Sequence, residues 1–250
     1  MSNTGQVAIV TGSGSGIGRA IALHLSELGY QIVVQDISSQ RAQETCELIS
    51  SQGGTSINVV GDVTSPADIE RTVAETISMW GRIDVHINNA GFCQVKTFMD
   101  ITLDEIKKMF EVHVFGTFLF TKAVVPHMQA RGYGRIINIV SAMGNGGSEF
   151  TSHYQAAKSA QQSLTRSAAI SFIKDGITSN SVSPTTVDTN LFHENDENFR
   201  KYLGHSAGDE LKRRAAGIRT TPVEAIDIAR AVGFLAAPDS YHINGQVIGI

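Results

Sequence analysis

Two groups of residues in this chain have the types and spacing needed for chemistry on a small molecule. A glycine-rich run, Thr11-Gly-Ser-Gly-Ser-Gly-Ile-Gly18, follows a short apolar segment. Far downstream, Tyr154 and Lys158 are four residues apart and share one face if the segment is helical. An ammonium near a phenol lowers the phenol pKa, so Tyr154 is predicted to exchange protons with an oxygen. An isolated pair of this kind is more often a surface feature, so whether Tyr154 and Lys158 form a reactive site depends on the elements that position them.

The glycine-rich run is suited to holding a pyrophosphate. Glycines permit the tight turn and the close approach of backbone to phosphate, and the helix that starts near Ile17 points free N–H groups at the anion. A strand pattern precedes the run and a helix pattern follows it, which is the context that the motif requires. The run contributes these expected cofactor-binding residues: Gly12, Ser15, Gly16, Ile17 and Gly18.

Asp36 ends the predicted second strand, 18 residues beyond Gly18. A carboxylate at this place accepts the ribose hydroxyls of NAD and repels the 2′-phosphate of NADP. Neither residues 13–15 nor residues 37–39 contain Lys or Arg to neutralise a phosphate. The sequence therefore predicts NAD(H) in preference to NADP(H); the alternative is that Asp36 is an ordinary turn residue.

Two more polar loops follow predicted strands. Asp62-Val63 comes after the third strand and Asn88-Asn-Ala-Gly91 after the fourth. Open α/β sheets bind ligands at the carboxyl ends of their strands, although simple turn chemistry also accounts for the Asn-rich run. These loops contribute the expected cofactor-binding residues Asp62, Val63, Asn89, Ala90 and Gly91.

Short apolar runs alternate with helical patterns along the chain, which at 250 residues suits one large domain. Such alternation predicts an α/β, doubly wound fold with a parallel sheet covered on both faces. The predicted strands are 7–10, 31–35, 57–60, 83–87, 135–140, 178–182 and 246–250. The predicted helices are 17–28, 39–51, 66–80, 103–130, 152–174 and one opened by Thr221-Pro222 and running to 236.

Residues 188–220 are polar and charged and show no strand pattern. A long irregular insertion in a compact domain is usually a lid or a binding loop, so we expect a substrate loop here; a solvated surface excursion is the alternative. Phe150, Phe192 and Phe199 are candidate apolar walls for a substrate, and Cys93 is expected to line the same pocket.

Composition narrows the class of protein. Apolar residues make up 42% of the chain and charged residues 18%, which is typical of a globular protein, and the net charge of −4 does not favour nucleic-acid binding. The polar opening residues do not resemble a secretory signal, and no apolar run is long enough to cross a membrane. Two cysteines suit a reducing compartment, so a cytoplasmic location is expected. The histidines show no metal-ligand spacing, and no metal is predicted.

In this combination and order, the chain resembles the classical short-chain dehydrogenase/reductase family. The matching residues are Thr11-Gly12-xxx-Gly16-Ile17-Gly18, Asn88-Asn89-Ala90-Gly91, Ser141, Tyr154-xxx-Lys158 and Pro184. The resemblance covers essentially the whole chain. It implies one Rossmann-like domain over residues 1–250 with a seven-stranded parallel sheet, and a homodimer or homotetramer.

The resemblance also implies roles for the catalytic residues. Tyr154 is the acid or base, Ser141 positions the substrate oxygen, and Lys158 tunes the tyrosine and holds the nicotinamide ribose. Residues 184–189 wrap the nicotinamide, with contacts from Pro184, Val187 and Thr189. The implied activity is NAD(H)-dependent interconversion of a secondary alcohol and a ketone, with a small molecule as the partner. Non-redox cyclase or isomerase chemistry and a non-catalytic pseudoenzyme stay open as alternatives.

Three features depart from the family pattern. His113 stands where the family carries an Asn that holds a helix kink and a proton-relaying water, so His113 is a further candidate catalytic residue that titrates near neutrality. Thr185 stands where Gly is usual and is strained if that position needs positive φ. The sequence ends before the usual Asp-Gly-Gly tail, which affects expected subunit contacts.

Overall fold

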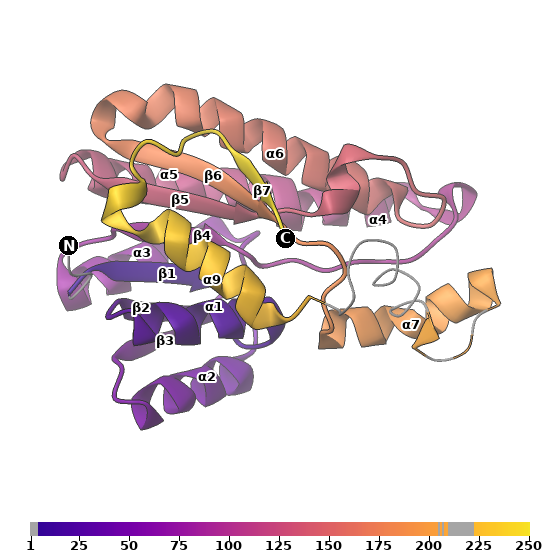
Figure 1. Ribbon diagram of the computed structural model, residues 1–250, viewed down its shortest axis with the longest axis horizontal. Coiled ribbons are helices and arrows are strands. Elements are labelled where there is room, and N and C mark those ends of the chain that lie inside the picture. The colour runs from indigo at the N-terminus through magenta and orange to yellow at the C-terminus, as the bar shows by residue number, and fades with distance from the viewer. Residues whose placement is uncertain (1–4, 205, 207, 210–222) are drawn as a thin grey trace.

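The computed structural model describes residues 5–204, 206, 208–209 and 223–250. Within them, seven parallel strands form one sheet in the order β3-β2-β1-β4-β5-β6-β7, which confirms the predicted doubly wound α/β fold (Figure 1). The strands are β1 (Val7–Thr11), β2 (Gln31–Asp36), β3 (Ser56–Val60), β4 (Val85–Asn88), β5 (Gly134–Ile139), β6 (Ile177–Ser183) and β7 (Val247–Gly249).

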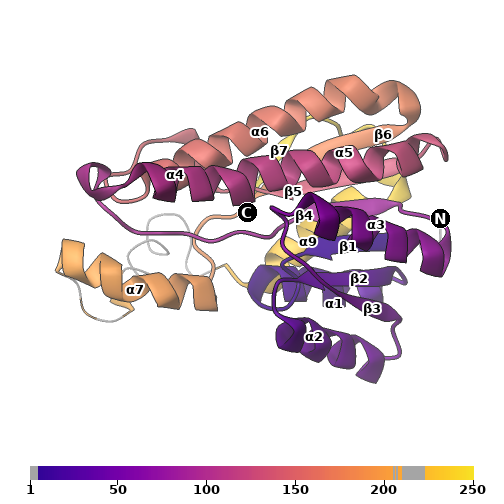
Figure 2. The same ribbon diagram turned by 180° about the vertical axis from the view of Figure 1, so that it is seen from behind.

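Helices cover both faces of the sheet, as Figures 1 and 2 show from opposite sides. One face carries α1 (Gly16–Glu27), α2 (Ser39–Ser51) and α9 (Ala225–Ala236), and the other carries α3 (Pro66–Trp80), α5 (Gly116–Gln129) and α6 (Ser152–Phe172). Side chains alternate along a strand, so in β1 Ala8 and Val10 pack on the first face while Val7 and Ile9 pack on the second. Burial on both faces explains why the strands read as continuous apolar runs.

The strand order changes direction at β1, which pairs with β2 on one side and with β4 on the other. Connections leaving β1 and β4 therefore diverge, and this is where open parallel sheets leave a crevice for a ligand. The shorter helical segments are α4 (Leu103–Phe110), α7 (Asn190–Leu203) and the 3₁₀ turns Phe98–Asp100, Ala142–Asn145, Ile173–Asp175 and Pro238–Ser240. Helix α7 lies beyond the carboxyl ends of the strands (Figure 1).

The segment expected as a single helix over residues 103–130 is interrupted. Between α4 and α5 the residues Glu111–Phe115 form a π-helical turn, in which the Gly116 amide donates to the Glu111 carbonyl. One extra residue is accommodated in the turn, so the side chains before and after it point in different directions than a regular helix would give them. Such insertions occur often at functional sites, and this one contains His113.

The insertion over residues 188–220 is not irregular throughout, so that prediction is wrong for Asn190–Leu203, which is α7. The helix is highly polar, and its apolar side rests chiefly on Phe192 and the buried Phe199, seven residues apart. The rest of the predicted loop at 205, 207 and 210–220 lies outside the described residues, as does Thr221-Pro222. No helix in the described part of the chain is both long and apolar enough to cross a membrane.

Tyr30 links the start of β2 to the end of α9. Its ring is buried at the start of β2 and its hydroxyl donates to the Ala236 carbonyl at the end of α9, at 3.0 Å. Tyr30→Phe leaves that carbonyl without its partner. We expect the free energy of unfolding to fall by about 1 kcal/mol, measured by urea denaturation. Tyr241→Phe, on a ring that is 55% exposed, is the control and is expected to change nothing; equal stability of both variants would contradict this role.

Candidate functional site

A cavity of about 1010 Å³ lies at the carboxyl ends of the strands. It is of the size that holds a large cofactor together with a small substrate. Every residue expected from the sequence to take part in catalysis or cofactor binding contributes to its lining: Gly12, Ser15, Gly16, Ile17, Gly18, Asp36, Asp62, Val63, Asn89, Ala90, Gly91, His113, Ser141, Tyr154, Lys158, Pro184, Val187 and Thr189. Residues separated by more than 170 positions in the sequence thus meet in one place.

The glycine-rich turn between β1 and α1 requires glycine for two reasons. Gly12 and Gly16 have φ of 62° and 52°, in the left-handed region that other residues rarely adopt. A Cβ on Gly18 would lie 2.2 Å from the Gly12 carbonyl oxygen. The helix then begins without a side-chain cap from Ser15, so its first N–H groups face the cavity without that competitor. This cradle fits a pyrophosphate.

Thr11 fastens the glycine-rich turn to the loop after β4. Its hydroxyl accepts from the amides of Asn89 (3.0 Å) and Ala90 (3.1 Å) and donates to the Ile87 carbonyl (3.2 Å). The Asn89 side-chain amide donates back to the Thr11 carbonyl at 2.9 Å. These bonds hold the two sides of the crevice at a fixed separation.

Asp36 is buried at the end of β2 and accepts three hydrogen bonds. The amide of Gly14 donates at 2.9 Å, the amide of Ser38 at 2.9 Å and the Arg41 guanidinium at 3.2 Å. Arg41 also lines the cavity. Arg41 lies just beyond residues 37–39, in which the sequence shows no cation, and the first turn of α2 carries it back over Asp36. A cation therefore stands beside the carboxylate that was expected to select NAD.

Tyr154 and Lys158 lie one turn apart on α6, with the Lys158 Nζ 5.7 Å from the centre of the Tyr154 ring. Burial lowers the pKa of Lys158 to about 7, while the nearby Cys93 opposes that shift. Burial also raises the pKa of Tyr154, as does Cys93, and a hydrogen bond with Ser141 acts the other way. The expectation that Lys158 lowers the Tyr154 pKa is therefore wrong for this structure, because desolvation of the phenol outweighs any help from the ammonium.

His113 is buried in the π-helical turn beside α6. Its Nε2 lies 2.8 Å from the Phe92 carbonyl and 3.2 Å from the Phe92 amide, and its ring meets Tyr154 edge-on at 5.5 Å. Burial, reinforced by the Lys158 charge, holds the His113 pKa well below its usual range, which corrects the expected titration near neutrality. A Cβ on Gly91 would lie 2.2 Å from the ring, so glycine there leaves room for the imidazole. The ring holds the backbone after β4.

The segment after β6 adopts its turn without strain. Thr185 donates to the Ile250 carbonyl through both its amide (2.9 Å) and its hydroxyl (3.0 Å). Every described residue with positive φ is a glycine, so the Thr185 position does not need glycine and the expected strain is absent. Val187 continues in a short parallel bridge to Val223, and Thr189 precedes α7.

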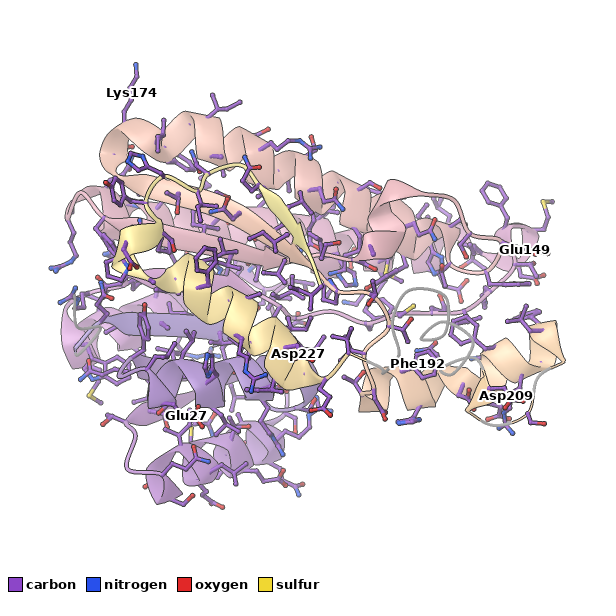
Figure 3. All side chains as sticks on the ribbon, in the orientation of Figure 1. Glu27, Glu149, Lys174, Phe192, Asp209 and Asp227 are labelled. Carbon is purple, nitrogen blue, oxygen red and sulfur yellow. The ribbon has the colours of Figure 1, made fainter. Side chains whose placement is uncertain are left out.

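Helix α7 supplies a wall that the sequence pattern only partly indicated. Phe192 and Phe199 line the cavity and stack at 6.1 Å, and Figure 3 shows Phe192 at this end of the molecule. Phe150 is not a lining residue and stacks instead on Tyr202 of α7 at 5.2 Å. Cys93 lines the cavity as expected, together with Lys108 and Asn195, which the sequence analysis missed because neither belongs to a recognisable motif. In the described residues no cluster of three or more His, Cys, Asp or Glu could hold a metal ion.

Comparisons with known proteins agree with this arrangement. The chain is 34% identical over 243 residues to the hydroxy(phenyl)methylsuccinyl-CoA dehydrogenase subunit BbsD of Thauera aromatica, covering 97% of this chain and 94% of that protein. It is 33% identical over 247 residues to an L-2,3-butanediol dehydrogenase of Corynebacterium glutamicum, covering 97% and 96%. A solved actinorhodin polyketide ketoreductase with NADPH superposes with a TM-score of 0.94 at 27% identity, covering 100% of this chain and 97% of that one.

The family model described as short chain dehydrogenase matches residues 6–199. That range begins just before β1 and ends within α7, so it contains the glycine-rich turn and the three residues Ser141, Tyr154 and Lys158. The match agrees with the resemblance that the sequence motifs indicated. The chain belongs to the short chain dehydrogenase family.

Proposed function

We propose that this protein is an NAD(H)-dependent oxidoreductase that interconverts a secondary alcohol and a ketone. The observation that carries the proposal is that Ser141, Tyr154 and Lys158 line the same cavity as the glycine-rich cradle of β1 and α1. A hydroxyl pair and an amine beside a pyrophosphate cradle have the chemistry needed for carbonyl reduction. Relatives named as a butanediol dehydrogenase and a sorbitol dehydrogenase support an alcohol as the substrate class.

In this proposal, one group of residues binds the cofactor and another transfers a proton to or from the substrate oxygen. Gly12 to Gly18 would hold the pyrophosphate, Asp36 the adenosine ribose, and Pro184, Val187 and Thr189 the nicotinamide. When bound, NAD(H) supplies or accepts the hydride. Ser141 donates a hydrogen bond to the substrate oxygen, and Tyr154 donates its phenolic proton to that oxygen as it becomes an alkoxide.

Burial favours one direction of proton transfer at neutral pH. Because burial raises the Tyr154 pKa, the phenol is the dominant form at pH 7 and is ready to donate to a ketone oxygen. Alcohol oxidation needs the phenolate, whose population rises with pH towards that raised pKa. Ketone reduction is therefore the direction favoured at neutral pH, and alcohol oxidation gains as the pH rises.

The position of His113 supports redox chemistry over a non-redox alternative in which His113 is the acid or base. Its Nε2 makes hydrogen-bonding contacts with the Phe92 backbone and its pKa is lowered, so the imidazole stays neutral and holds this backbone in place. Turnover of a ketone with consumption of NADH separates the proposed enzyme from a cyclase, an isomerase and a pseudoenzyme alike.

The proposal extends to location and assembly: a cytoplasmic protein that forms a homodimer or homotetramer and binds neither nucleic acid nor membrane. Phe115 and Phe118 support self-association, since both are 53% exposed and lie three residues apart, Phe115 at the end of the π-helical turn and Phe118 in the first turn of α5. Large aromatic side chains that are half exposed and close together are typical of protein interfaces.

Tyr154→Phe removes the proposed proton donor while keeping the ring. We expect kcat for ketone reduction to fall by at least about 100-fold, because general acid catalysis contributes that much or more. NADH binding should be retained, and Tyr241→Phe should leave kcat unchanged. In the wild-type enzyme, the rate of alcohol oxidation should rise between pH 7 and pH 10. A Tyr154→Phe enzyme of normal activity would rule out this role.

Asp36→Ala tests the cofactor preference in a fluorescence titration with NADH and NADPH. We expect the wild-type protein to bind NADH more tightly and the variant to lose that preference, because the carboxylate no longer repels the 2′-phosphate. Arg41→Ala in the Asp36→Ala background should then weaken NADPH binding, since the guanidinium lies 3.2 Å from the Asp36 carboxylate and would be left to attract the 2′-phosphate. Glu75→Ala, outside the cavity lining, is the control. Tighter binding of NADPH by the wild type would contradict the proposal.

Phe118→Ser tests the proposed self-association. We expect sedimentation velocity to show a smaller assembly than for the wild type, because a polar residue replaces an aromatic contact at the interface. Met79→Ser on α3, whose side chain is 58% exposed, is the matched control and should keep the wild-type assembly. An unchanged assembly in the Phe118 variant would place the interface elsewhere.

A further inference from the structure

Lys158 is held by a line of buried hydrogen bonds that runs away from the cavity. Its Nζ donates to the Ile139 carbonyl at 2.8 Å and to Gln161 Oε1 at 2.9 Å. The Gln161 Nε2 donates to the Thr117 hydroxyl at 2.7 Å, and that hydroxyl donates to the His113 carbonyl at 2.8 Å. The three side chains in this line, those of Lys158, Gln161 and Thr117, are at least 95% buried, so water does not compete for these bonds.

The chemistry of Thr117 decides which way the Gln161 amide faces. A threonine hydroxyl carries one proton, and here that proton is directed at the His113 carbonyl in the π-helical turn. The hydroxyl oxygen can then only accept from Gln161, so it must receive the amide N–H. The amide oxygen is consequently turned to Lys158, and the orientation follows from the network itself.

Two acceptors on Nζ leave one position of the nitrogen for the cavity. An ammonium has three N–H groups, of which two are directed at Ile139 and Gln161. The third position points away from these acceptors, and Lys158 lines the cavity. It carries a proton in the ammonium and a lone pair in the amine. Because neither an amide nor a threonine hydroxyl titrates near neutral pH, protons reach or leave Lys158 from the cavity side.

We propose that Gln161 is a positioning residue for Lys158: its amide oxygen, oriented through Thr117, directs Nζ into the site and stabilises the ammonium against burial. The use made of Lys158 in catalysis rests on the proposed function, whereas its orientation and protonation rest on these contacts alone. An apolar residue at 161 would leave Nζ with the Ile139 carbonyl as its one remaining partner among these.

Other groups also face Lys158 and belong in any account of its titration. Tyr154 lies on the same helix, Cys93 approaches from the loop after β4, and His113 lies in the π-helical turn. Burial is the main cause of the lowered Lys158 pKa, and Cys93 opposes it. His113 stays neutral near pH 7 because its own pKa is depressed, so it does not titrate together with the lysine.

The test measures the pKa of Lys158 in the protein without cofactor, by an NMR pH titration of lysine labelled with ¹³C at Cε. Lys158→Met assigns the resonance. Gln161→Glu and Gln161→Leu have similar size but opposite electrostatic effects on an ammonium. We expect the Lys158 pKa to rise in the Glu variant and to fall in the Leu variant, each by about one pH unit. Thr117→Val should shift it in the same direction as the Leu variant, by less, because the amide loses its anchor.

Gln162→Leu is the matched control, since Gln162 is buried on the same helix and its side-chain nitrogen has no hydrogen-bond partner among the described residues. It should leave the Lys158 pKa unchanged. A general loosening of α6 would shift the Glu and Leu variants in the same direction, and that result would overturn the proposal, as would no shift in either. If one of the two Gln161 variants does not fold, the sign of the Lys158 pKa shift in the other, together with that in Thr117→Val, still decides whether Gln161 positions Lys158.

The outcome is separable from that of the proposed function. Opposite pKa shifts with no alcohol or ketone turnover would uphold the role of Gln161 and refute the oxidoreductase. In an active enzyme, Gln161→Leu should lower kcat while leaving the dissociation constant for NADH close to that of the wild type.

Discussion

The pairing of β1 with both β2 and β4 is the constraint on which the rest of the site depends. It makes the connections after β1 and β4 run in opposite directions, and the crevice between them receives the glycine-rich turn on one side and the Asn-rich loop on the other. Thr11 spans the crevice with hydrogen bonds to Asn89 and Ala90. Helices bury both faces of the sheet, so this edge is where polar side chains from many strands can meet.

Burial governs the electrostatics of the site more than charge pairing does. Tyr154 and Lys158 are both shifted towards their neutral forms, and desolvation is the largest cause for each. Removing an ionisable group from water is costly unless hydrogen bonds replace the lost hydration. The Lys158 ammonium receives such replacements from Ile139 and Gln161, while the phenol of Tyr154 has Ser141. The result is a site in which Tyr154 holds its proton at neutral pH, while Lys158, with a pKa of about 7, is close to the point of gaining or losing one.

The strands and the motif residues could be predicted from the sequence because each has a local signature. Strands buried on both faces read as short β-branched runs, and the loop residues that follow them project to one edge. Helix α7 escaped prediction because its burial rests on two phenylalanines in a polar segment. Arg41 returns to Asp36 only through the first turn of α2. The Tyr154 pKa depends on tertiary burial, which spacing along the chain does not report.

The hidden face of α6 is polar, carrying Gln155, Lys158, Gln161, Gln162 and Thr165 among its buried residues. A helix with an apolar buried face loses little packing energy when it shifts slightly, because one methyl group takes the place of another. A helix with a polar buried face loses its hydrogen bonds, because donor and acceptor meet in one position only. Sliding α6 by one turn would move its side chains by about 5.4 Å and separate Lys158 from the Ile139 carbonyl and Gln161 from the Thr117 hydroxyl. These polar contacts therefore fix the position of α6 relative to the sheet, and with it the positions of Tyr154 and Lys158.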